Sequence, residues 1–489
     1  MPRPLAGLRQ LAARTPASRD RYVDSLRALA ITLVVLGHWL VTVIAHTPDG
    51  RLTGHSALPD LRWAWPLTWL VQVLPVFFLV GGYANAASLT AHRDRGGSTV
   101  TWLLDRGRRL LLPTTVLLVT LALAALVARI AGADPKLVRD AVWFAAIPLW
   151  FLSPYLLVVL LTRPMYALHR RYGVAVPLVL AGLVALGDLA RLAGHGGLAV
   201  GGFLFGWLAI HQVGFAWRDA CAGRPGWPTR PRVLVPLLVG GFTATVLLTW
   251  LGPYPVSMIN IPGERLHNMS PPSLALLTLA TTQIALILLL RRLGSRLPAI
   301  LHLSPPSAHN GRRQPQDRGE GRDGGATAGW TLVVAINAFV LTVFLWHVSA
   351  VLLLAGLLDA LGVLPTPPVG TLDWWLWRVP WLLMLIVLLA GLVAVFGRVE
   401  TRAAHRLRDA VPDQRGGRAT TRSALTVAGF AAATAGLVGI NAAPRAGEQL
   451  LGMPGWALAS FLVGVAALEL ARATTARARP PQPDGQVRR

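Results

Sequence analysis

The sequence predicts an all-α membrane protein, a polytopic bundle of about twelve transmembrane helices. The 489-residue chain is 54% hydrophobic and only 14% charged, whereas soluble domains carry roughly 25% charged residues. Its apolar residues gather in runs of about 20, the length that the hydrocarbon core of a bilayer requires of a spanning helix. These runs are too long for the roughly 10-residue strands of a membrane barrel and do not alternate apolar with polar residues, so strands are not expected.

The distribution of basic residues supports this helix count. With the N-terminus placed inside, 37 of the 46 Lys and Arg residues fall in segments on the inner side, which is a strong positive-inside signal. Both termini are therefore predicted to be cytoplasmic, in a multi-pass protein of the cell membrane. The helices are expected at residues 23–45, 66–90, 109–130, 140–162, 173–192, 198–217, 233–252, 272–292, 330–358, 373–397, 424–442 and 454–472.

The net charge of +24 follows from this topology. Basic segments on the inner side orient the chain and attract anionic membrane lipids, so no nucleic-acid partner is expected. Residues 1–19 form a basic tail that leads into an uncleaved first helix, because the apolar run is longer than that of a signal peptide and no small-residue cleavage site follows it. Cys221 is the single cysteine, which excludes an internal disulfide and a Cys-based zinc cluster, and no metal site is predicted.

Two segments are too polar to form a buried core. Residues 296–329 are rich in Pro, Gly and charge and are predicted to form a disordered cytosolic loop, and residues 473–489 a disordered tail. Residues 398–472 hold a basic linker and the last two helices, to which no motif assigns a role. The remaining segment, residues 20–397, contains ten helices.

An ionisable residue deep in a membrane helix is a functional candidate, because burying it is costly. His38 lies in the middle of the first apolar run, and Arg27 precedes it by 11 residues. Eleven residues make about three helical turns, so both lie on one face, about 16 Å apart along the axis. Structural roles compete with this interpretation: His38 as a neutral imidazole bonded to a neighbouring helix, and Arg27 as an anchor at the membrane surface.

The first helix resembles that of the acyltransferase-3 family of membrane acyltransferases. The shared pattern is an Asp (Asp24), an Arg three residues on (Arg27), an apolar run, and a His eleven residues after the Arg (His38). Gly81 departs from the family pattern, which usually has Ser there. Further motifs resemble the family's in the same order over residues 20–397: FFLVGGY at Phe77, Phe78, Gly82 and Tyr83; RGRRLLLP at Arg106, Arg109 and Pro113; LWFL at Trp150, Phe151 and Leu152; and LWH at Trp346 and His347.

The resemblance implies transfer of an acyl group, often acetyl, from cytosolic acyl-CoA to a hydroxyl of a glycan or lipid-linked acceptor. In such an enzyme Arg27, Arg106 and Arg109 would hold the phosphates of CoA, and Asp24 would orient Arg27. Structural ion pairing and positive-inside anchoring are the competing roles for these residues. His38 would meet the thioester either as a general base or as a nucleophile, and the sequence does not separate the two.

Other residues and segments are candidates for further roles. Tyr83 would donate a hydrogen bond to a developing oxyanion or serve as an interfacial aromatic. His347 would assist on the outer side or simply pack. The outer loop 252–272 is a candidate for contact with the acceptor, and the Trp-rich stretch 373–381 indicates an interfacial aromatic belt first and a sugar-stacking surface second.

Two other classes of protein have similar sequence features. A twelve-helix secondary transporter has the same helix number, but it usually carries paired carboxylates or broken helices near the midplane, whereas the deep ionisable groups here are mainly His. A membrane scaffold, or a family member without activity, is consistent with the missing serine hydroxyl at Gly81. A transporter would show substrate flux without acyl-CoA, and a scaffold neither flux nor acyl transfer.

Overall fold

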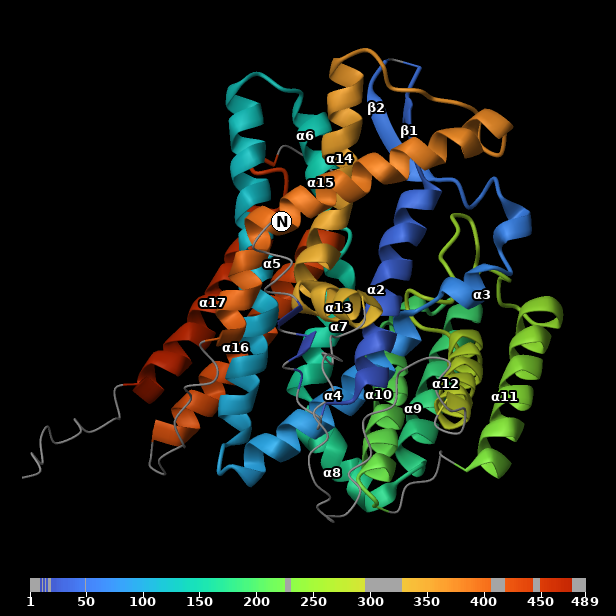
Figure 1. The fold of residues 1–489 in the computed structure, drawn as a ribbon, viewed down its shortest axis with the longest axis vertical. Coiled ribbons are helices and arrows are strands. Elements are labelled where there is room, and N and C mark those ends of the chain that lie inside the picture. The colour runs from blue at the N-terminus through green and yellow to red at the C-terminus, as the bar shows by residue number, and fades with distance from the viewer. Residues whose placement is uncertain are drawn as a thin grey trace, which may run out of the picture.

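The computed structural model is a bundle of helices with one small hairpin (Figure 1). It describes residues 9–10, 12–13, 15, 19–48, 50–224, 230–294, 328–405, 418–442 and 449–476. Of the predicted loop 296–329 and the predicted tail 473–489, residues 296–327 and 477–489 lie outside the described residues, as does most of the predicted tail 1–19. Residues 328–329 and 473–476 were predicted to be disordered but belong to helices, at the start of α13 and the end of α17.

The elements are, in chain order, α2 (Arg21–Val41), β1 (Thr42–His46), β2 (Leu52–Ser56), η1 (Arg62–Ala64), α3 (Thr68–Val71), α4 (Leu74–Asp94), α5 (Thr99–Ile130), α6 (Pro135–Ala146), α7 (Leu149–Leu160), α8 (Thr162–Tyr172), α9 (Ala175–Leu192), η2 (Gly196–Gly201), α10 (Gly202–Cys221), α11 (Pro231–Val246), η3 (Leu247–Leu251), α12 (Leu274–Gly294), α13 (Ala328–Ala338), α14 (Val340–Ala360), α15 (Leu372–His405), α16 (Arg418–Ala442) and α17 (Gly455–Ala476).

The all-α membrane bundle is confirmed. Among the described residues, eleven helices are long and apolar enough to cross a membrane. Helices α6 and α7 are bent by 43° at the break between them and form a twelfth span if the pair crosses as one. The placement of both termini in the cytoplasm stays a prediction.

The first helix is shorter than predicted, because its last residues form a strand. The expected helix 23–45 ends at Val41, and Thr42–His46 pairs antiparallel with Leu52–Ser56, with Thr42 opposite Ser56. The expectation of no strands was wrong for this segment, where β-branched Thr, Val and Ile follow one another and favour extended backbone. We call this end of the bundle the hairpin end, and the opposite end, where α8 lies, the basic end (Figure 1).

The predicted helix 330–358 is two helices, α13 and α14, separated at Phe339. The side chain of Glu400 on α15 accepts hydrogen bonds from the backbone N–H groups of Leu341 and Thr342, at 3.2 and 2.9 Å, and from the Thr342 hydroxyl at 2.7 Å. The first N–H groups of a helix have no partner within it, so this carboxylate satisfies the start of α14 from a neighbouring helix. Glu400 thereby allows a new helix to begin inside the apolar run.

The third predicted helix, 109–130, begins ten residues earlier than expected. The Ser98 hydroxyl accepts a hydrogen bond from the Thr101 backbone N–H and caps α5, so the basic RGRRLLLP segment lies within the helix and Pro113 is an interior residue. As a result Arg106 and Arg109 are held on a rigid helix rather than in a loop.

The buried apolar side chains form two large clusters on either side of a seam. One is built mainly from α5, α6, α7, α14 and the helices that follow. The other is built mainly from α4, α9, α10 and α12. Three half-buried aromatic side chains pack against both clusters: Phe77, Phe151 and Tyr155. This seam lies beside α2, the helix that carries the predicted site.

The last two helices are part of the first cluster. Phe430 of α16 and Phe461 of α17 are fully buried, and a Cβ at Gly107 of α5 would lie 3.1 Å from the Phe430 ring. Arg472 of α17 lies 3.5 Å from the Asp105 carboxylate, and Arg108 lies 3.7 Å from Glu469. The C-terminal pair therefore supports α5, the helix that carries Arg106.

Candidate functional site

The structure brings together two of the histidines identified in the sequence. His38 of α2 and His347 of α14 lie side by side, with Nδ1 of His38 2.7 Å from Nε2 of His347 and the rings nearly parallel at 8°. His347 is fully buried, whereas His38 is half-buried. A pair of imidazoles 309 residues apart in sequence is thus held in hydrogen-bonding contact.

The hydrogen bonds of the pair fix which nitrogens carry protons. Nδ1 of His347 lies 2.6 Å from the Phe344 carbonyl oxygen, and a carbonyl can only accept, so Nδ1 of neutral His347 carries the proton. Its Nε2 then has a lone pair and accepts from the Nδ1–H of His38. Nε2 of His38 is left with a lone pair, and no described residue forms a hydrogen bond with it. This order of protons presents His38 Nε2 as a proton acceptor.

Two contacts hold the helices that carry the pair. The indole N–H of Trp39, next to His38, donates to the His347 carbonyl oxygen at 2.9 Å and ties α2 to α14. The Asp20 side chain accepts from the Tyr22 and Val23 backbone N–H groups and caps the start of α2. Together with Glu400, which caps α14, these contacts set the relative position of the two rings.

Arg27 lies on α2 toward the basic end, about 16 Å along the axis from His38. Its Nη1 is 3.4 Å from Oδ1 of Asp24, and Asp24 also pairs with Arg19. Asp24 is buried, and its backbone carbonyl accepts a hydrogen bond from Asn337 of α13 at 2.9 Å. Asp24 is therefore placed to orient Arg27, as the sequence pattern predicted, and it also serves as a structural ion-pair partner.

Arg106 reaches toward Arg27 from α5. Its Nη2 donates to the Ser88 hydroxyl at 2.7 Å and to the Ala84 carbonyl at 3.3 Å, both on α4. Arg27, Arg109 and Tyr155 are close enough to interact electrostatically with Arg106. Arg109 itself is exposed. The guanidinium groups of Arg27 and Arg109 thus act electrostatically on that of Arg106 at the basic end of the seam.

Aromatic side chains connect these arginines with the histidine pair. The Tyr155 ring stacks on Phe151 at 5.8 Å, Phe151 contacts Phe344 at 5.6 Å, and Phe344 contacts His347 at 5.9 Å between ring centroids. Gly81 lies against this row, because a Cβ placed there would be 3.6 Å from the Tyr155 hydroxyl. The family resemblance implies a serine hydroxyl at this position, and the phenol hydroxyl of Tyr155 on α7 lies beside it.

Tyr83 lies apart from the histidine pair. Its hydroxyl donates to the Asp20 carboxylate at 3.0 Å, and Asp20 also pairs with Arg291 of α12 at 2.8 Å. Asp20 precedes His38 by 18 residues, which is about 27 Å along a helix. The phenol of Tyr83 is therefore engaged near the start of α2 and does not point to an oxyanion formed beside His38.

The predicted acceptor loop 252–272 is folded rather than open. Asn268 is buried and donates to the carbonyls of Pro255 and Ser257, at 2.7 and 2.9 Å. The neighbouring Tyr254 hydroxyl donates to Asp188, and burial raises the pKa of this phenol. Asn268 thus stabilises the fold of the loop. The contact of loop 252–272 with the acceptor stays a prediction.

Several residues of this arrangement were not predicted from the sequence. Trp39 and the Phe344 carbonyl fix the histidines through a backbone group or an indole N–H, which no sequence pattern encodes. Tyr155 and Glu400 act across helices that are distant in sequence. Among the described residues, no three His, Cys, Asp or Glu side chains gather as a metal site would require.

Comparison with known proteins gives one match. No curated protein and no solved structure matches the chain. A family model described as an acyltransferase domain, Acyl_transf_3, matches residues 20–397, the segment that contains α2, the arginines at the basic end and both histidines. With more than three quarters of its length covered by that model, and with the family's Arg and His on one face of the first helix, the chain belongs to the acyltransferase-3 family of membrane acyltransferases.

Proposed function

We propose that this protein moves an acyl group, in the first instance acetyl, from acyl-CoA at the cytosolic side to a hydroxyl of a glycan or lipid-linked acceptor. In the reaction, the acceptor oxygen attacks the thioester carbonyl while Nε2 of His38 takes its proton. The C–S bond then breaks, and the CoA thiolate receives that proton from His38. The products are the O-acyl acceptor and free CoA, and no further reactant is needed.

The observation that carries the proposal is the order of hydrogen bonds from Phe344 to His347 to His38. It leaves a lone pair on His38 Nε2, which is the state that a general base requires. When His38 becomes protonated in the transition state, its Nδ1–H strengthens the bond to His347 Nε2. His347 acts as a positioning residue, since it selects the tautomer and orientation of His38 without touching the substrate.

The basic end of the seam suits the donor. CoA carries several phosphate charges and a long pantetheine arm, and guanidinium groups bind phosphates through charge-assisted bonds. Arg27 and Arg109 interact electrostatically with Arg106 there, and the row Tyr155, Phe151 and Phe344 offers apolar contact for the arm. The axial distance of about 16 Å from Arg27 to His38 suits an arm that must bring the thioester to the imidazole.

The test compares wild type with His38→Ala in membranes supplied with labelled acetyl-CoA, at matched protein levels. We expect transfer or slow thioester hydrolysis to fall by about 10²–10⁴-fold, the range for removing a general base. His46→Gln is the matched control, because His46 lies at the hairpin end, is exposed and pairs with Asp359. Equal activity of wild type and His38→Ala would contradict the proposal.

A second measurement separates a base from a nucleophile. Wild-type protein is mixed with labelled acetyl-CoA without acceptor, quenched, and digested for mass spectrometry. A general base leaves no label on the protein, whereas a nucleophile leaves an acetyl group on the peptide that contains His38. Label on His38 would replace the one-step transfer by a two-step transfer through the same nitrogen.

A further inference from the structure

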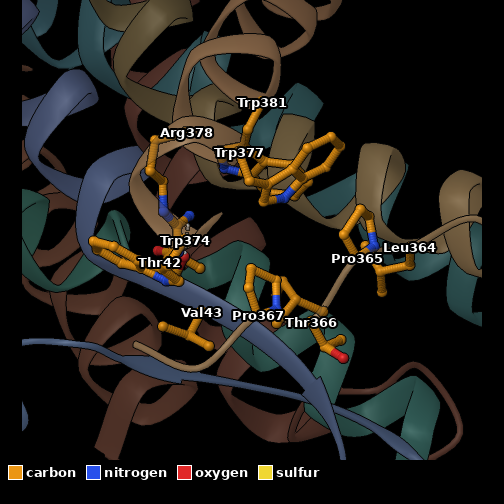
Figure 2. A pocket seen from close by; sticks show the side chains of 11 residues that line it. Thr42, Val43, Leu364, Pro365, Thr366, Pro367, Trp374, Trp377, Arg378 and Trp381 are labelled. Carbon is orange, nitrogen blue, oxygen red and sulfur yellow. Dashed lines mark hydrogen bonds between the residues drawn. The ribbon is translucent and has the colours of Figure 1, made fainter. Parts of the chain in front are cut away.

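A hollow lies at the hairpin end, one helical turn beyond His38. It is formed by the start of β1, the residues 364–367 that precede α15, and the first turns of α15 (Figure 2). Thr42 lines it, and the Thr42 hydroxyl donates to the His38 carbonyl oxygen at 2.6 Å. The hollow therefore lies next to the histidine that the proposed reaction uses, on the side opposite to the arginines of the basic end.

The hollow contains a cation that the described residues do not neutralise. Arg378 is 6% exposed, its Nη1 donates to the Thr42 carbonyl at 2.9 Å, and its guanidinium lies over the Trp374 ring at 4.2 Å from the ring centroid. No described carboxylate pairs with Arg378, and its Nε has no acceptor in the described part of the chain. A buried guanidinium without a counter-ion is costly, so its presence points to an anion that binds there.

Two indoles add further donors and no acceptor. Trp374 and Trp381 are each 2% exposed and line the hollow, and their N–H groups have no acceptor among the described residues. Trp377 lines it as well and keeps some exposed surface. The hollow thus combines three unpartnered N–H donors, one positive charge and aromatic faces, which together suit a ring that carries an oxyanion.

We infer that this hollow binds the acceptor through a carboxylate or phosphate group carried on a sugar. The inference rests on the proposed function and narrows its acceptor to an anionic carbohydrate. Arg378 and the indole N–H groups bind the oxyanion, and the exposed surface of Trp377 contacts the apolar face of the ring. A hydroxyl of the same sugar or of the next one then lies toward His38, because Thr42 belongs to both the hollow and the turn that ends at His38.

The test measures binding without acyl-CoA, so that its result does not depend on acyl transfer. The full chain in nanodiscs of phosphatidylcholine is dialysed against a labelled trigalacturonate, with maltotriose as the neutral counterpart. We expect trigalacturonate to bind at least 10-fold more tightly than maltotriose. Arg378→Gln is expected to weaken trigalacturonate binding by 10-fold or more, and Arg378→Lys by less. Arg62→Gln, at an exposed arginine of the same end, is expected to leave it unchanged.

Further arms identify the source of the oxyanion and guard against misfolding. Competition by polyisoprenyl phosphate against trigalacturonate assigns the site to the phosphate of a lipid-linked sugar, and absence of competition assigns it to a glycan carboxylate.

Trp374→Phe removes one N–H and keeps the ring, so a several-fold loss of trigalacturonate binding supports the site even if Arg378→Gln is unstable. Equal binding of the two trisaccharides, equal loss in Arg62→Gln, or competition by phosphatidylglycerol alone overturns the inference. Binding without any acyl transfer would instead overturn the proposed function and leave the site standing.

Discussion

The arginines on either side of His38 differ in how the protein compensates their charge. At the basic end, Arg27 is partly exposed and pairs with Asp24, and Arg106 donates to Ser88 and Ala84. At the hairpin end, Arg378 is buried and lacks a carboxylate partner among the described residues. In the first set, Asp24 offsets the charge of Arg27, whereas Arg106 bonds only to neutral groups. At the second, the anionic acceptor that we propose would supply the missing charge.

His347 bonds to His38, which lies between the two sets of arginines. Among the variants below, substitution of His347 should reduce acyl transfer the most. His347→Leu removes the acceptor for His38 Nδ1–H, so the proton is free to move to Nε2 and the base is lost in part. We expect kcat to fall on the order of 10²-fold, with little change in the KM for acetyl-CoA.

Rescue distinguishes positioning from packing. The carbonyl of His347→Gln accepts from Nδ1–H and should recover part of the activity, although the side chain has a different shape. The pH–rate profile of this variant should also differ from that of wild type, because the imidazole that bonds to His38 is gone. If His347→Leu and His347→Gln lose activity equally and keep the wild-type pH profile, His347 only packs.

Arg106 and Arg109 offer the next test, which concerns the donor side alone. Arg106 is held against α4 by Ser88 and faces the seam, whereas Arg109 is exposed on the same helix. Arg106→Gln is expected to raise the KM for acetyl-CoA about 10-fold, as for one lost charge-assisted contact, and Arg109→Gln less. Steady-state kinetics at fixed acceptor concentration measures both. An Arg106→Gln variant that binds trigalacturonate less well than wild type would contradict the division of donor and acceptor between the two ends.

The arrangement at the basic end was easier to predict from the sequence than that at the hairpin end, and the reason is geometric. Arg27 and His38 belong to one helix, so helical periodicity alone places them on one face. His347 joins them only through the packing of α14 on α2, and the sequence left its role open. The stretch 373–381, which contains Arg378, indicates an aromatic belt first and a sugar-stacking surface second, and nothing in it shows that no described carboxylate comes near Arg378 in the fold.

The helix boundaries show the same limit. Hydropathy predicted about twelve spans, and the long apolar runs became the expected helices. It did not predict the break at Phe339, because an unbroken apolar run gives no signal for a cap that comes from another helix. Glu400 supplies that cap from a position just beyond residue 397, where the family match ends. The start of α14 thus depends on a residue outside the matched segment.

Glu400 therefore provides the test with the smallest expected effect on chemistry. Glu400→Ala removes the acceptors for Leu341 N–H, Thr342 N–H and the Thr342 hydroxyl, and a lost helix cap costs roughly 0.5–2 kcal/mol of stability. We expect a lower thermal unfolding midpoint and a few-fold loss of kcat, because His347 lies only five residues beyond Thr342 and shifts with the first turns of α14. Glu400→Gln keeps one acceptor oxygen and should recover part of both the unfolding midpoint and kcat.

Glu469→Ala is a matched control, since that carboxylate lies at the α17–α5 contact and caps no described helix. Full activity of Glu400→Ala alongside a lowered unfolding midpoint would mean that Trp39 alone is sufficient to hold the histidine pair in register.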